Sequence, residues 1–136
     1  MRPPLRARGA AILTALVAVG ALLAGCGATS APAGTAASGI THPEIGFRSA
    51  ERLDEHYRKH GREFGDVTRD EYLRIAQSLR DRPAGGAVLE AVRDDSVVTR
   101  FDRADGAFLA FDPDLVIRTL FKPNDGEAYF VRQAGG

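Results

Sequence analysis

The chain has 136 residues, with 18 lysines and arginines against 18 aspartates and glutamates, a single cysteine and no tryptophan. This length suits one domain rather than two, because domains average about 100–200 residues. One cysteine cannot form an internal disulfide framework or a cysteine-rich zinc cluster. A net charge of +0 argues against a protein that coats nucleic acid through bulk electrostatic attraction.

The start of the chain has the organisation of a bacterial export signal. Residues 1–8 are basic and contain no acid, and residues 10–24 are apolar and uncharged. An apolar run of about 15 residues is too short to span a membrane as a helix, and a basic segment before it is typical of a secretory signal peptide. The sequence LAGC at its end resembles the lipobox of bacterial lipoproteins, in which the signal is cut just before a cysteine that carries a diacylglycerol. We expect residues 1–25 to be removed and Cys26 to anchor the exported protein to a cell-envelope membrane through its lipid. The alternative is an ordinary signal peptide with an incidental cysteine.

A tether and one folded domain are expected after the signal peptide. Residues 27–41 are uncharged and consist almost entirely of small residues and proline, so we expect residues 26–46 to form a flexible tether ahead of a domain at 47–133. Loss of three arginines with the signal would leave 15 basic against 18 acidic residues, a net charge of −3. Binding of a polyanion would therefore require a local basic patch.

Two helices are predicted at the start of the domain. Ser49 can cap a helix over about 50–60. Thr68 and Glu71 form a T-x-x-E capping box that predicts the start of a second helix.

Short strands at a spacing of about ten residues follow, separated by turn sequences. They are predicted at 88–92, 96–101, 107–111, 116–122 and 127–132. The predicted fold class is α+β, with two N-terminal helices packed on one face of a four- to five-stranded antiparallel meander. The predicted core is Phe47, Leu53, Phe64, Tyr72, Ile75, Leu79, Val98, Phe108, Ile117 and Phe130.

Two histidines fall on one face of the first predicted helix. His56 and His60 are four residues apart, on the same face as Leu53 and Tyr57. They could pack and hydrogen-bond as structural residues, or one could act as a general acid or base, because imidazole titrates near neutral pH. A zinc site is a third interpretation, but it needs a further ligand that the sequence does not offer nearby.

Cations and hydroxyls on the predicted strands complement these histidines. Strand alternation places Arg118 and Lys122 on one face of 116–122 and Thr119 on the other, unless a bulge redirects the strand. Arg100 and Tyr129 add a cation and a phenol. This combination suits a phosphodiester, whose charge arginine and lysine neutralise while histidine moves a proton. In RNA the 2′-hydroxyl is an internal nucleophile, so no metal or other cofactor is required.

Several segments resemble, in order and spacing, a known toxin domain. They are HYRKHGREFG (56–65), DEYLRIAQ (70–77), VTRFD (98–102), AFLAFDPDLVIRTLFKP (107–123) and YF (129–130). Together they look like the C-terminal toxin domain of contact-dependent and other polymorphic bacterial toxins, which is placed with the barnase–EndoU–colicin–RelE-like (BECR) ribonuclease fold. The resemblance covers essentially all of 47–133 and implies a metal-independent endoribonuclease, often directed at tRNA.

The resemblance also implies roles for individual residues and partners. His60 would transfer the proton beside His56, Thr119 would hydrogen-bond a phosphate oxygen, and Tyr129 would stack on a base or donate a hydrogen bond. The implied catalytic residues are His60, His56, Thr119 and Tyr129, and the implied phosphate ligands are Arg100, Lys122 and Arg118. We expect a monomer whose partners are RNA, a cognate immunity protein and, through the lipid, a membrane. The toxin would act in a target-cell cytoplasm.

Two other functions fit the same sequence. A non-catalytic envelope lipoprotein could use this scaffold as a binding module, which would account for the lipobox and the weak net charge. A zinc-dependent envelope enzyme is the third hypothesis. Positions 56, 60, 119 and 129 are titratable or polar. A purely structural core would have leucine or valine there, so these residues support the ribonuclease.

Overall fold

The computed structural model describes residues 39–135, so Cys26 and the predicted signal peptide lie outside the described residues. The elements, in chain order, are α1 (Ala50–His60), a 3₁₀ helix η1 (Gly61–Phe64), α2 (Arg69–Asp81), β1 (Val88–Val92), β2 (Val98–Asp102), β3 (Ala107–Phe111), β4 (Ile117–Phe121) and α3 (Glu127–Ala134). Within this part of the chain, no helix is long and apolar enough to cross a membrane.

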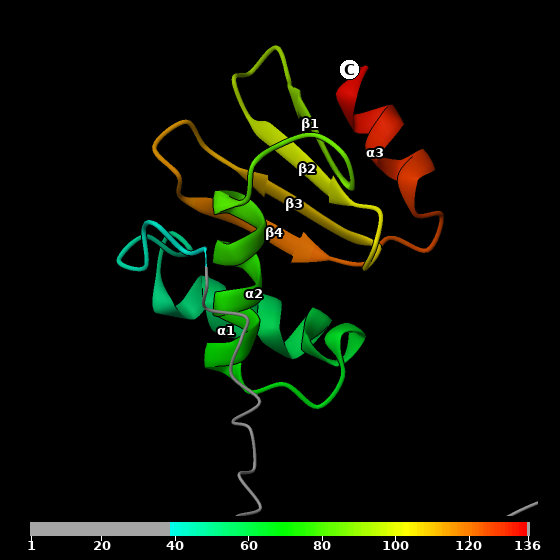
Figure 1. The fold of residues 1–136 in the computed structure, drawn as a ribbon. Helices are drawn as coiled ribbons and strands as arrows, with labels where there is room; N and C mark the ends of the chain where they lie inside the picture. Colours follow the sequence, from blue (N-terminus) through cyan, green and yellow to red (C-terminus); the bar gives the residue numbers. More distant parts are fainter. Residues whose placement is uncertain (1–38, 136) are drawn as a thin grey trace, which may run out of the picture. The chain divides into compact units, whose positions relative to one another are not determined.

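The four strands form one antiparallel sheet in the order β1-β2-β3-β4 (Figure 1). Each strand pairs with the next one along the chain, which confirms the predicted α+β class and the meander. The two N-terminal helices also begin where their caps predict. The Ser49 side chain accepts a hydrogen bond from the Arg52 amide, and Thr68 and Glu71 form a complete capping box.

The predicted fifth strand over 127–132 is wrong, because these residues begin the helix α3. Tyr129, Phe130 and Ala134 all contact one hydrophobic cluster, and Phe130 and Ala134 have the four-residue spacing of a helix face. In contrast, the side chain of Val131 is 59% exposed. The short apolar run YFV could not by itself distinguish the two periodicities.

Helices cover both faces of the sheet. Ala107, Leu109 and Phe111 of β3 pack in one cluster with residues of α1 and α2, whereas Phe108 and Ala110 pack in a second cluster with Phe130 of α3. All five residues of β3 are therefore buried. The expectation of helices on one face only is corrected by α3, and both clusters lie entirely within residues 39–135.

Most of the predicted core is confirmed, although part of it lies at the core's margin. Leu53, Tyr72, Leu79, Phe108, Ile117 and Phe130 are buried. Phe47, Phe64, Ile75 and Val98 are half-buried and pack against the first cluster.

The segment 41–47, most of which we expected to belong to the tether, is bound to the folded domain. The backbone amides of Thr41 and His42 donate to the Asp81 carboxylate at 2.9 and 3.1 Å. Phe47 forms a parallel bridge with Ile117 of β4. These contacts fix the chain immediately before α1 and so determine where α1 lies against the sheet.

Candidate functional site

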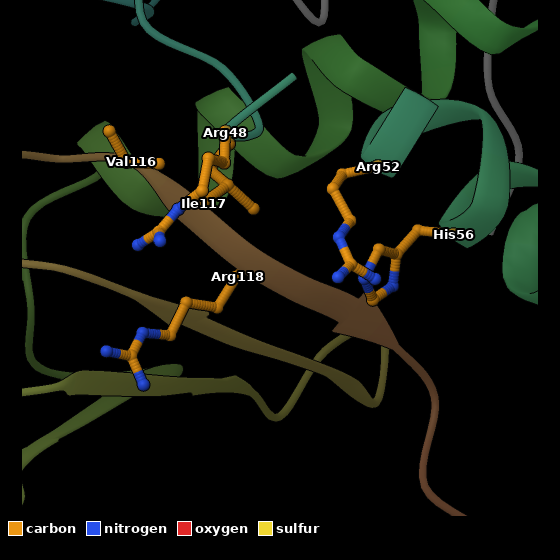
Figure 2. A pocket seen from close by; sticks show the side chains of 6 residues that line it. All are labelled: Arg48, Arg52, His56, Val116, Ile117 and Arg118. Atoms are coloured by element: carbon orange, nitrogen blue, oxygen red, sulfur yellow. The ribbon is translucent and has the colours of Figure 1, made fainter. Parts of the chain in front are cut away.

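The face of α1 that carries the two histidines lies next to β4, an edge strand of the sheet. Arg52, His56 and His60 occur at four-residue intervals, which places them on one side of the helix. Figure 2 shows the side chains of Arg52 and His56 extending from α1 towards β4. The spacing of the two histidines predicted this face, but Arg52, one turn before His56, was missed.

A pocket of about 380 Å³ lies between the start of α1 and β4 (Figure 2). Three arginines and a histidine provide its polar lining. The lining residues are Arg48, Arg52, His56, Val116, Ile117 and Arg118. A concave surface with this excess of guanidinium groups suits an anion such as a phosphate or a carboxylate.

Arg118 reaches the pocket because β4 contains a bulge. The register with β3 shifts between Ala110 and Phe111, so that Ile117 pairs with Phe111 while Thr119 pairs with Ala110. Arg118 is the extra residue, and its side chain is 47% exposed. The predicted alternation along 116–122 is therefore wrong, since a bulge adds one unpaired residue and Ile117 and Leu120 both enter the first cluster.

One carboxylate links two arginines of the pocket. Asp112 Oδ1 accepts from Arg118 Nε at 2.7 Å, and Asp112 Oδ2 lies 3.4 Å from Arg48 Nη2. The third arginine, Arg52, pairs with Glu55 at 2.8 Å. The pocket therefore exposes guanidinium groups to solvent although each has an acidic partner.

The surroundings of His56 favour the neutral form of its imidazole. Its ring centroid lies 5.2 Å from that of Phe47, and its buried Nδ1 has no hydrogen-bond partner in the structure. Burial, followed by the nearby charge of His60, lowers the pKa of His56. An unpartnered nitrogen in the wall of an arginine pocket leaves this side chain with hydrogen-bonding capacity that the fold does not use.

His60 is oriented by Glu63. Nδ1 of His60 lies 2.8 Å from Glu63 Oε1, and because an ionised carboxylate only accepts, this nitrogen carries the proton in the neutral ring. Glu63 Oε2 accepts from the Lys122 backbone amide at 2.6 Å, which fixes the carboxylate in turn. The other ring nitrogen, Nε2, is thereby left as the basic atom, an arrangement that suits a general base.

The rings of His56, His60, Phe121 and Tyr129 form a continuous row. The centroids of His56 and His60 are 6.2 Å apart, and those of His60 and Phe121 are 5.3 Å apart. Phe121 also contacts Tyr129 edge-on at 5.3 Å. Phe121 therefore lies between Tyr129 and His60, and Tyr129 comes from α3 and not from the strand that we predicted.

Thr119, within β4, and Lys122, just after it, lie in environments outside the pocket. Thr119 faces the second cluster, beside Ala110. The Lys122 ammonium is 2.6 Å from Asp105 Oδ1 and 5.0 Å from the centre of the Phe64 ring. Neither residue lines the arginine pocket.

Arg100 has a structural role. Its guanidinium donates to the carbonyls of Leu79, Arg80 and Arg82 at the end of α2 and pairs with Glu90. Its side chain is only 11% exposed. A phosphate could bind Arg100 only by displacing contacts that hold α2 to the sheet, so the geometry separates Arg100 from the pocket.

Four residues of this region were missed in the sequence: Arg48, Arg52, Glu63 and Asp112. Arg52 and Glu63 had a local signal, because each is one helical turn from a histidine. Arg48 and Asp112 had none, since only the folding of residues 46–48 onto β4 brings them together.

Within residues 39–135, no three histidine, cysteine, aspartate or glutamate side chains converge as a metal-binding group. No protein-family model matches the chain, and no curated protein matches it.

Proposed function

We propose that the chain is a metal-independent endoribonuclease toxin, with tRNA as the candidate substrate. The observation that carries the proposal is the contact between His60 and Glu63. His60 lies one helical turn after His56, which lines the arginine-rich pocket. This arrangement supplies the two functions that RNA cleavage through the 2′-hydroxyl requires, a positioned base and a cationic seat for phosphate.

The reaction follows from these two functions. His60 Nε2 accepts the proton of the 2′-hydroxyl, and the 2′-oxygen attacks the phosphorus atom. The bond from phosphorus to the 5′-oxygen breaks, and that oxygen leaves with a proton from a protonated imidazole or from water. The products are a 2′,3′-cyclic phosphate and a 5′-hydroxyl, while Arg52 of the pocket neutralises the charge on the transferring phosphate.

The test uses residues 27–136, which contain both hydrophobic clusters and every described element. The protein should cleave RNA to cyclic phosphate ends and leave 2′-O-methyl RNA intact. Replacement His60→Ala should lower the rate about 10²- to 10⁴-fold, the usual contribution of general acid–base catalysis. His42→Ala is the matched control, because its side chain pairs only with Glu44 at 3.4 Å and lies outside the pocket. Equal activity of both variants would refute the role of His60.

Glu63 is proposed as a positioning residue that acts through His60. Glu63→Gln can still accept a hydrogen bond at the ring nitrogen but loses the charge that complements a protonated imidazole. We expect kcat to fall while KM stays unchanged, since Glu63 contacts the base and not the phosphate pocket. A rise in KM at constant kcat would contradict this assignment.

A non-catalytic binding module is the second candidate function. The structural roles of Arg100 and the packing of Tyr129 against Phe108 and Phe121 favour it, because they remove two residues from the site implied by the resemblance. RNA that is bound without being cut, with the same affinity for wild type and His60→Ala, would establish this function instead.

Export and lipid anchoring complete the proposal. The basic and apolar start of the chain and the LAGC sequence support removal of residues 1–25 and acylation of Cys26. Full-length protein produced in bacteria with radiolabelled palmitate should incorporate the label, and Cys26→Ser should not. Growth arrest when residues 27–136 are made in the cytoplasm, relieved by a cognate immunity protein, would support action as a toxin.

A further inference from the structure

Asp112 holds two arginines of the pocket in the way that a phosphate group would. Its two carboxylate oxygens face different guanidinium groups, Arg118 at 2.7 Å and Arg48 at 3.4 Å. The Asp112 side chain is 13% exposed, while those of Arg48 and Arg118 are 75% and 47% exposed. The acid is therefore sheltered, and the cations that meet it remain accessible to a ligand.

The position of Asp112 is fixed by the turn between β3 and β4. Its amide donates to the Val116 carbonyl at 2.9 Å, and its carbonyl accepts from the Leu115 amide at 2.8 Å. Arg118, in contrast, projects from the bulge of β4, and Arg48 lies just before α1. The arginines thus come from separate segments with flexible side chains, and they can change partner while the backbone around Asp112 stays in place.

We propose that Arg48, Asp112 and Arg118 form a second phosphate subsite, in which a phosphate of single-stranded RNA replaces the Asp112 carboxylate between the two arginines. This inference rests on the proposed function and deepens it. The phosphate to be cleaved lies at His60, and a neighbouring phosphate of the same strand takes the two arginines. The substrate class is consequently an RNA with at least two phosphates, and Asp112 disfavours shorter ligands because one weak contact cannot displace it.

The chemistry favours a phosphate that replaces the Asp112 carboxylate over one that binds beside it. Carboxylate and phosphate both accept charge-assisted hydrogen bonds from guanidinium groups, but phosphate offers more acceptor oxygens and more charge. The Asp112 carboxylate is sheltered, so leaving it without its arginines has a cost that the phosphate contacts must exceed. Its removal should therefore strengthen phosphate binding, whereas removal of either arginine should weaken it.

Binding of uncleavable 2′-O-methyl oligouridylates to residues 27–136 tests the subsite without requiring catalysis. The dinucleotide carries one phosphate and the trinucleotide two. For the trinucleotide, Asp112→Asn should lower Kd about fivefold, as loss of two partly exposed ion pairs predicts. Arg118→Ala should raise it about tenfold and reduce the slope of log K against log salt by about 0.7, the value for one phosphate contact in single strands. For the dinucleotide, Arg118→Ala should leave the salt slope unchanged.

Arg103→Ala and Glu127→Gln are matched controls, because these two residues form an exposed ion pair of 2.7 Å between the β2–β3 turn and α3. Neither should change the affinity for either oligonucleotide. Circular dichroism and a thermal melt of each variant verify that it folds. Equal effects of Arg118→Ala on the dinucleotide and the trinucleotide would overturn the second subsite, as would unchanged or weaker trinucleotide binding in Asp112→Asn.

Failure of the subsite and failure of the ribonuclease proposal give different results. Cleavage of natural RNA that depends on His60, combined with Asp112→Asn and Arg118→Ala variants that bind like wild type, would refute only the subsite. The predicted binding changes without any cleavage would support the subsite and refute the enzyme.

Discussion

Replacement of Arg80 should show how strongly the fold depends on one buried cation. The Arg80 side chain is fully buried and pairs with Asp81 at 2.6 Å. It also donates to the carbonyls of Ile45 at 2.6 Å, His42 at 2.8 Å and Leu115 at 3.2 Å. Arg80 thus joins the end of α2 to the segment before α1 and to the turn between β3 and β4.

The expected loss in the free energy of unfolding follows from the groups that Arg80→Met leaves without a partner. Methionine fills most of the volume, but the Asp81 carboxylate, only 2% exposed, loses its counter-charge, and three carbonyls lose a donor. Removal of one partner of a buried pair costs about 3–5 kcal/mol. The two amides that still donate to Asp81 place the expected loss towards the lower end of that range.

Urea unfolding of residues 27–136, followed by circular dichroism, measures this loss. Arg80→Met should lower the free energy of unfolding by about 3 kcal/mol. Asp81→Asn in the Arg80→Met background should recover at least 1 kcal/mol of it, because no unpaired charge then remains buried. A loss below about 1 kcal/mol, the range of an exposed pair, would refute the argument that burial makes this pair essential.

Four further predictions concern other residues. Burial alone would raise the pKa of Asp81, but hydrogen bonds from Arg80 and two amides lower it to about 2. The free energy of unfolding should therefore fall by about 2 kcal/mol between pH 4 and pH 2. An acid titration of the urea midpoint checks this. Burial lowers the pKa of His56 below its usual 6.5, so stability should fall as the pH drops below 6.5, and His56→Gln should remove that slope in the same titration. Tyr72 is fully buried and its hydroxyl donates to the Leu120 carbonyl at 2.6 Å. Tyr72→Phe should lower the free energy of unfolding in urea by about 1–3 kcal/mol. A loss near zero would mean that this carbonyl finds another donor. Ser96 is exposed with a φ of 65°; Ser96→Gly should raise the melting temperature because glycine adopts this conformation without strain, and a lower melting temperature would contradict the strain.

The parts of the fold that were predicted correctly depend on local signals. The cap at Ser49 and the capping box at Thr68 located α1 and α2, and turn sequences separated the four strands. The helix over 127–134 was missed because YFV satisfies both strand and helix patterns over so short a run. This segment forms a helix because its apolar side chains cover the second face of the sheet, where they pack with Phe101 of β2 and Phe108 of β3.

Of the residues that line the pocket, His56 and Arg118 were predicted, the first from its helix face and the second from its strand. His56 and His60 were found because their spacing places them on one face, and the structure brings them to the sheet. Arg100 has the same residue type and strand context as a phosphate ligand, but its side chain bonds the carbonyls at the end of α2. The bulge at Arg118 has no signature in the sequence, and it determines which side chains of β4 reach the pocket.

The covering of the second sheet face by α3 has a consequence for how the protein is made. Synthesis proceeds from the N-terminus at about 5–20 residues per second, so α3 leaves the ribosome after all four strands. Until then Phe101, Phe108 and Phe121 have no helix to cover them, and Phe121 is the ring against which His60 rests. A chain that stops before residue 127 would therefore leave these aromatic side chains uncovered, so premature termination should give an aggregation-prone product.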